Sequence, residues 1–161
     1  MRKRGVIFLR ILVLSDSHGQ AKTMQRAIEA QPSAEVIIFL GDGYTDFEYC
    51  KSFIGNKRVY AVKGNNDFHC EYPKNQVIDA DGIKIYITHG HYEYVKSTLG
   101  GVLNNAMENN CKIALYGHTH RQQSDYYKEI HAFCPGAIYN NEYGVIDITE
   151  KGIICIGMRL K

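Results

Sequence analysis

Short runs of apolar residues recur along the chain, and most of them end in glycine or serine followed by polar residues. β-Branched and aromatic residues dominate these runs, which is the pattern of buried strands. The expected strands cover residues 7–14, 36–40, 58–62, 83–88 and 112–116. Helical patterns separate them, at residues 20–31, 44–53 and 94–110. The first two-thirds of the chain therefore alternates between strand and helix.

The first helical pattern is the clearest of the three. Met24, Ala27 and Ile28 recur at the spacing of one helix face, and Pro32 ends the pattern. The third pattern is weaker because it contains the pair Gly100–Gly101.

The last third of the chain has a different pattern. Short apolar runs joined by tight turns predict strands at residues 129–134, 137–140, 143–149 and 152–160, which we expect to form a β-meander. The whole pattern predicts an α/β protein with two sheets in one domain over residues 1–161, since no linker-like stretch divides it.

Composition narrows the class of protein. The 161 residues are 45% hydrophobic and 22% charged, as expected for a globular domain with a real core. The net charge is only +2, and basic residues cluster only at Arg2–Arg4, so nucleic acid is not an expected partner. No apolar run approaches the roughly 18 residues of a membrane span, so no membrane association is expected.

The N-terminus and the cysteines both bear on the cellular compartment. Residues 1–15 begin like a signal peptide, but Arg10 interrupts the apolar run and no small-residue cleavage site follows, so a strand is the better interpretation. The five cysteines are odd in number and lack a C-x-x-C pair, which argues against a disulfide framework. We therefore expect a cytoplasmic protein.

Side chains of metal-binding types follow five of the predicted strands. They are Asp16, His18, Asp42, Asn65, His89, His118 and His120, with Asp67 and His91 beside them. Ligands of open α/β sheets bind at the carboxyl ends of the strands, where these residues are expected to meet. A mixture of carboxylate, imidazole and amide oxygen suits Mn²⁺, Fe²⁺, Ni²⁺ or Zn²⁺.

Seven such residues are too many for one tetrahedral ion, and they suit two ions that share a carboxylate. Two neighbouring cations are the arrangement that attacks phosphate esters. In an extended segment, residues two apart point to the same side, so Asp16 and His18 are expected to face one ion. His118 and His120 would reach two neighbouring ions. Each motif alone is more often a turn or a solvated edge, but five in order are not independent accidents.

These motifs together resemble the calcineurin-like metallophosphoesterases. The matching motifs are Asp16-Ser17-His18, Gly41-Asp42, Gly64-Asn65-Asn66-Asp67, Thr88-His89-Gly90-His91 and Gly117-His118-Thr119-His120. The small size and the last two motifs are similar to those of the compact bacterial and archaeal YfcE-type phosphodiesterases. The resemblance implies two facing mixed β-sheets flanked by α-helices, a four-layer αββα sandwich.

The resemblance also implies roles for the site residues. Asp16, His18, Asp42 and His120 would hold one ion, and Asp42, Asn65, His89 and His118 the other. Mn²⁺ is the expected metal, with Ni²⁺, Fe²⁺ and Zn²⁺ as alternatives. A hydroxide between the metals would attack the phosphorus of a small phosphodiester, and Asp67 would position its neighbours.

Asn66 departs from the pattern of many members, which have a histidine directly after the metal-binding asparagine. An amide cannot donate a proton as a general acid, so we expect a preference for activated leaving groups, with His91 as partial compensation. Arg121 is a weaker candidate for phosphate contact and Tyr44 for the substrate pocket.

Two other functions stay open. One is a phosphomonoesterase, or an enzyme acting on nucleotides. The other is a non-catalytic, metal-binding interaction scaffold, which some relatives on this fold have become. The complete set of seven ligand residues favours an enzyme over a scaffold. The apolar strands of the tail could pair with a second subunit, so a homo-oligomer is also left open.

Overall fold

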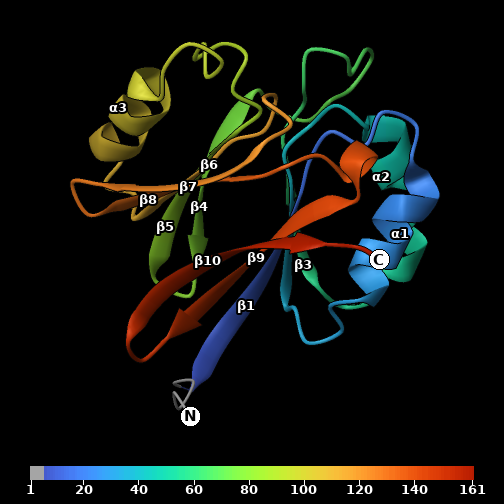
Figure 1. Cartoon of the computed structure of the whole chain (residues 1–161), viewed down its shortest axis with the longest axis horizontal. Helices are drawn as coiled ribbons and strands as arrows, with labels where there is room; N and C mark the ends of the chain where they lie inside the picture. The colour runs from blue at the N-terminus through green and yellow to red at the C-terminus, as the bar shows by residue number, and fades with distance from the viewer. Residues whose placement is uncertain (1–5) are drawn as a thin grey trace.

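Two five-stranded sheets face each other in the computed structural model, which describes residues 6–161 (Figure 1). Sheet A contains, in spatial order, β10 (Gly152–Arg159), β9 (Glu142–Thr149), β1 (Ile7–Leu14), β2 (Val36–Phe39) and β3 (Arg58–Ala61). Sheet B contains β4 (Asn75–Ala80), β5 (Ile83–Thr88), β6 (Ile113–Leu115), β8 (Ile130–Pro135) and β7 (Gln122–Tyr127). The basic residues 2–4 and the start of the predicted domain lie outside the described residues.

Helices cover the outer face of each sheet. Helices α1 (Ala21–Glu29) and α2 (Tyr44–Cys50) lie beside sheet A, and α3 (Gly100–Glu108) lies beside sheet B (Figure 1). Short 3₁₀ turns occur at Lys51–Phe53 and Ile138–Asn140. The predicted four-layer αββα architecture is therefore confirmed.

The central strands are apolar on both faces because both faces are covered. On β1, Ile11 and Val13 pack in the core between the two sheets, whereas Leu12 and Leu14 point to the other side and pack against Met24 of α1. A continuous apolar run is the expected sequence of a parallel strand buried in this way. The side chains of β1 therefore join three of the four layers.

The parallel strands bring the polar motifs to one edge. In sheet A, β2 runs parallel to both β1 and β3, and in sheet B, β6 runs parallel to β5 and β8. The two edges are joined by hydrogen bonds: the backbone N–H of His118 donates to Asp16 Oδ2 at 3.0 Å, and a ring nitrogen of His89 lies 2.7 Å from the carbonyl oxygen of Leu40. Motifs from distant parts of the chain thus meet at the shared edge.

The third helix is shorter than the sequence predicted. It begins at Gly100, and residues 91–97 form turns instead of the helical start expected from residue 94. The Glu93 carboxylate accepts hydrogen bonds from the hydroxyls of Tyr86 and Thr88, at 2.6 and 2.9 Å. These bonds hold the segment around Glu93 against β5, so this segment forms turns and the helix starts only after it.

The predicted meander is wrong. Strand β8 pairs in parallel with β6 in sheet B, whereas β9 pairs antiparallel with β1 in sheet A, so the tail is divided between the sheets. Residues 137–140, expected as a strand, contain a 3₁₀ turn that ends at Asn141 in the left-handed conformation. Strands β4 and β7 were not anticipated.

The structure also bears on the membrane expectation. Among residues 6–161, no helix has the length and apolar character needed to cross a membrane.

Candidate metal centre

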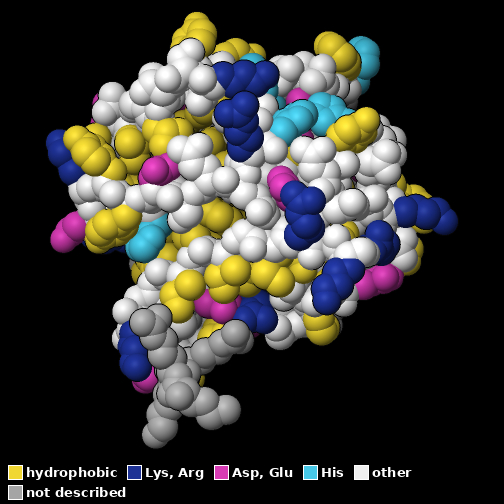
Figure 2. Space-filling model, in the orientation of Figure 1, with side chains coloured by type: hydrophobic (Ala, Val, Ile, Leu, Met, Phe, Trp, Pro, Cys, Tyr) yellow, Lys and Arg dark blue, Asp and Glu magenta, His cyan; other side chains and the backbone are white. Residues whose placement is uncertain are grey.

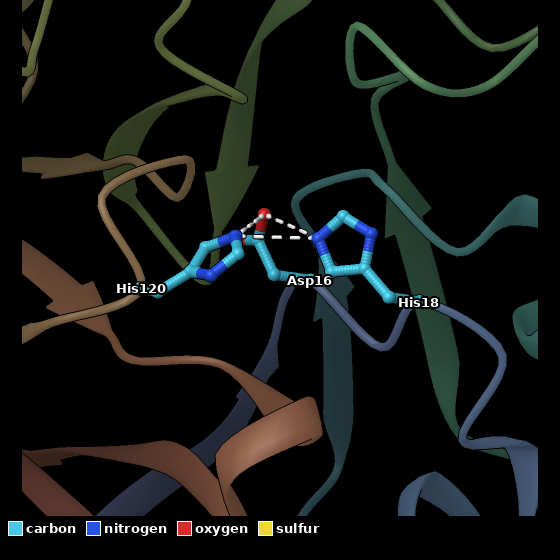
Figure 3. Close-up of side chains that lie close together, drawn as sticks. All are labelled: Asp16, His18 and His120. Carbon is cyan, nitrogen blue, oxygen red and sulfur yellow. Dashed lines mark hydrogen bonds and ion pairs between the residues drawn. The ribbon is translucent and has the colours of Figure 1, made fainter.

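A first cluster of metal-binding atoms lies where the two sheets meet. It consists of Asp16 and His18, which follow β1, and His120, which follows β6 (Figure 3). The Nε2 atoms of His18 and His120 lie 3.2 Å apart, and they lie 3.6 and 3.1 Å from Asp16 Oδ1. Asp16 is fully buried, and within residues 6–161 nothing donates a hydrogen bond to its Oδ1 atom.

A second cluster adjoins the first and contains Asp42, His89 and His118. His89 Nε2 lies 3.4 Å from Asp42 Oδ2 and 3.0 Å from the side-chain oxygen of Asn65. The opposite ring nitrogen of His89 faces the Leu40 carbonyl oxygen at 2.7 Å and must carry a proton to bond with it. In the neutral imidazole, Nε2 is then an acceptor that faces two oxygen acceptors.

Both clusters have the chemistry of cation sites. Lone pairs of nitrogen and oxygen converge in each cluster with fewer donors than acceptors, and either a bound cation or a proton removes that conflict. Asp42 Oδ2 lies 3.8 Å from His18 Nε2 and 3.4 Å from His89 Nε2, so this carboxylate faces both clusters. The residues present therefore fit two adjacent divalent cations.

The predicted ligand residues reach the clusters through left-handed backbone. Five of them have a positive φ, between 43° and 70°: Asp16, His18, Asp42, His118 and His120. The expected extended segments, with side chains alternating at every second residue, are therefore wrong for the loops that follow β1 and β6. Sharp turns directly after the strands direct these side chains to the edge instead.

Two glycines are required by close packing at the centre. A side chain at Gly64 would collide with the carboxylate and backbone of Asp42, and one at Gly117 would collide with Ser15 and with the carboxylate of Asp16. These two glycines therefore leave room for the carboxylates of Asp42 and Asp16.

Asp67 organises the loops without pointing at the clusters. Its carboxylate accepts backbone hydrogen bonds from Asp42, Gly43, Tyr44 and Gly64, at 2.8 to 2.9 Å. These donors lie in the two loops that follow β2 and β3. The positioning role that the resemblance implies for Asp67 has this physical basis.

Asn66 binds Asp42 through its backbone and through one of the two N–H groups of its side-chain amide. Its backbone N–H and its side-chain amide each donate to the Asp42 carboxylate, at 2.8 Å. His91 lies beside the second cluster, with its ring centroid 5.4 Å from that of His89 and 6.0 Å from that of His118. Its buried Nδ1 atom has no hydrogen-bond partner among the described residues.

Asp46 is a positioning residue that the sequence argument missed. It is buried in the first turn of α2, where its carboxylate accepts hydrogen bonds from the Ser17 hydroxyl at 2.5 Å and from the backbone of Gly19 at 2.8 Å. It thereby fixes both residues that flank His18. Its only sequence signal was an acidic residue at the start of a helical pattern, which is too common to indicate this role.

The carboxylates and imidazoles of the centre shift each other's pKa. Burial acts to raise the pKa of the Asp16 carboxyl, but its contacts with His120 and His18 hold that pKa below its ordinary value. The Asp16 contact raises the pKa of His18, and the Asp42 contact raises the pKa of His89 against the effect of burial. Burial and the charges of His89 and Lys96 lower the pKa of His118 to about 4.

Metal binding is expected to weaken as the pH falls through the raised pKa values of His18 and His89. A cation must displace the protons that these imidazoles hold, so binding near neutral pH releases protons. His118, with its pKa near 4, should contribute none. Calorimetric Mn²⁺ titrations in two buffers of different ionisation enthalpy measure this release. Binding that is independent of pH between about 6 and 8 would contradict the expectation.

Comparisons with known proteins agree with this geometry. Residues 9–151 match the model of the calcineurin-like phosphoesterase superfamily domain. The chain belongs to the calcineurin-like phosphoesterase superfamily. The family that the motifs indicated is thereby confirmed, and with it a metallophosphoesterase centre as the general class of site.

Two named relatives of this calcineurin-like phosphoesterase are bacterial. It is 31% identical to the probable metallophosphoesterase YsnB of Bacillus subtilis over 130 residues, which cover 81% of this chain and 75% of YsnB. It is 28% identical to the phosphodiesterase YfcE of Escherichia coli, with 92% of each chain covered. The similarity to YfcE agrees with the subgroup that the motifs indicated.

A solved structure shows how widely the calcineurin-like phosphoesterase fold is shared. Vacuolar Protein Sorting 29 from Cryptosporidium parvum superposes with a TM-score of 0.77 at 16% identity, and the match covers 97% of this chain and 93% of that one. At this identity the similarity establishes the fold alone.

Proposed function

We propose that this protein is a dinuclear metal-dependent phosphodiesterase that hydrolyses small phosphodiesters. The observation that supports this most directly is the position of Asp42, whose carboxylate faces both ligand clusters. Two cations held this close form a clamp for the phosphoryl group. Similarity to the phosphodiesterase YfcE supports the choice of diesters.

The chain's residues divide the work of binding and orientation. In the proposal, Asp16, His18 and His120 hold one cation, His89, His118 and Asn65 hold the other, and Asp42 holds both. When bound, the cations would supply an activated water and would neutralise charge on the phosphate. Mn²⁺ fits the mixed oxygen and nitrogen donors, as do Fe²⁺, Ni²⁺ and Zn²⁺.

Cationic side chains near His118 suit an anionic substrate. Lys96 and Arg121 line one surface depression together with Thr119, which lies between the two ligands His118 and His120. In Figure 2, Lys and Arg side chains gather beside His side chains at the upper part of the molecule. Such charges attract a phosphate ester toward the centre.

Neither Asn66 nor His91 can act as a strong general acid toward the leaving group. The Asn66 amide is engaged by Asp42, and burial and the charge of His89 lower the pKa of His91, so its imidazole is neutral at pH 7. A neutral His91 can hydrogen-bond a departing oxygen but is a poor proton donor to it. Diesters with activated leaving groups are therefore the expected substrates.

The first test is hydrolysis of bis(p-nitrophenyl) phosphate by metal-stripped protein, with and without Mn²⁺. Turnover should require the metal and should fall at least about a hundredfold in His118→Ala, because loss of a direct ligand exceeds the effect of losing an outer contact. His131→Ala is the matched control, since His131 lies on β8 and outside both clusters.

The scaffold alternative makes the opposite prediction. A folded protein that binds metal but shows no turnover with any divalent ion would contradict the enzyme and favour a binding module. A higher rate on p-nitrophenyl phosphate than on the diester would instead favour a phosphomonoesterase.

A further inference from the structure

One hollow in the surface is continuous with the metal centre and has aromatic residues at its side. Its volume is about 440 Å³, which is in the range of sites for small organic molecules. Its lining includes His18, Asp42 and Asn66 of the metal centre, and also Tyr44 and Phe68. A molecule whose phosphate reached the metal ligands would therefore have space beside it for one organic substituent.

Among residues 6–161, Phe68 is the large hydrophobic residue with the highest exposed fraction. Its exposed fraction is 76%, although it lies at a depression and next to Asp67. A single exposed phenylalanine is ordinary on a protein surface. This one differs because it lines a hollow that also contains metal-binding residues, so a ligand there would cover its ring.

Tyr44 is held in place relative to the metal centre, and Phe68 is the chain neighbour of the residue that holds it. The backbone N–H of Tyr44 donates to the Asp67 carboxylate at 2.9 Å, and Phe68 directly follows Asp67 in the chain. The Tyr44 ring meets the Tyr72 ring edge-to-face, with centroids 5.2 Å apart. The Tyr72 hydroxyl in turn donates to Glu48 of α2. The Asp67 carboxylate that binds both loops therefore also anchors the backbone of Tyr44, and Phe68 directly follows Asp67.

The charges around the hollow select against a second anion. The acidic residues Asp46 and Asp67 are among its lining, whereas the cations Lys96 and Arg121 line a different depression. A neutral planar group is compatible with two acidic neighbours and gains from stacking on an aromatic ring. Hydrophobic side chains also lie next to the His side chains on the face shown in Figure 2.

We infer that this hollow is the subsite for one ester group of the substrate, and that it selects phosphodiesters carrying a neutral planar aromatic group. Phe68 supplies the stacking surface, and Tyr44 forms the fixed wall. The inference rests on the proposed phosphodiesterase function, because it takes the metal centre as the place of the phosphate. It makes Phe68 a specificity-determining residue of that site.

Binding of two phosphodiesters to the Mn²⁺-loaded protein tests this inference without relying on turnover. Diphenyl phosphate and diethyl phosphate carry the same charge and differ in their ester groups. By calorimetry, Phe68→Ala should weaken diphenyl phosphate binding about three- to tenfold and leave diethyl phosphate binding within about twofold. Phe68→Tyr should retain the preference for the aromatic diester, since its ring is kept.

Phe8→Ala is the matched control, because Phe8 is also exposed but lies near the start of β1, whereas the metal ligands follow its end. It should leave both affinities unchanged.

Equal effects of Phe68→Ala on the two diesters, or no effect on either, would overturn the inference. If the protein turned over diesters with no dependence on Phe68, the subsite would fail and the proposed function would stand. If diphenyl phosphate bound through Phe68 without turnover of any diester, the subsite would stand and the proposed catalysis would fail.

Discussion

Asp42→Asn should lower phosphodiester turnover about a thousandfold, the largest effect of any single substitution at the centre. Asparagine keeps the shape of the side chain but removes the charge that faces both clusters. Two cations stabilise the charge of a phosphoryl transition state by several kcal/mol, and each 1.36 kcal/mol is a factor of ten in rate. The rate on bis(p-nitrophenyl) phosphate and the metal content per chain are the measurements.

The metal content separates this explanation from simple unfolding. We expect fewer than two cations per chain in Asp42→Asn, with thermal unfolding of the metal-free protein still cooperative. Asp125→Asn is the control, because Asp125 lies exposed on β7 and faces neither cluster. A turnover rate within about threefold of the parent, in protein that retains both cations, would be incompatible with a bridging role for Asp42.

Asp67→Asn should be the most destabilising conservative change in the loops around the centre. The carboxylate accepts four backbone hydrogen bonds, from Asp42, Gly43, Tyr44 and Gly64. An amide offers only one acceptor oxygen and turns two donors toward N–H groups that need an acceptor. We expect a loss of about 3 kcal/mol in the free energy of unfolding, or roughly 10 °C in the melting temperature.

Thermal unfolding of the metal-free protein checks this, since loss of bound metal then cannot contribute. Asp79→Asn is the matched control because the Asp79 carboxylate accepts a single backbone hydrogen bond, from Gly82 in an exposed turn at 2.7 Å. Its effect should stay below about 1 kcal/mol. Equal melting temperatures for Asp67→Asn and Asp79→Asn would show that the four bonds at Asp67 contribute little.

The pattern of apolar residues was sufficient to predict those strands in which burial determines the residue type. Strands β1 and β5 have the bounds that their apolar runs predicted, and both pack in the core between the sheets. Strand β7 could not be found in this way because every residue in it is exposed. Its place is set by pairing with β8, which is an interaction that a polar sequence does not reveal.

The site was predictable in its membership and less so in its geometry. The residue types and their order after successive strands predicted that these side chains meet, and the structure places them at one edge because parallel strands end there. The left-handed backbone at residues such as Asp16 and His118 was not predictable, because aspartate and histidine take that conformation only when the surrounding fold demands it. Asp46 was missed because its partners, Ser17 and Gly19, are brought to it only by the packing of α2.

The two sheets contribute to each ligand cluster, and this has a mechanical consequence. Asp16 and His18 follow a strand of sheet A, whereas His120 follows a strand of sheet B, and the second cluster is divided in the same way between Asp42 and His89. Each bound cation would therefore act as a cross-link between the two halves of the sandwich. A ligand that binds only the folded state adds its binding free energy to stability. Metal supply would then govern how firmly the two layers are held together, as well as whether the protein is active.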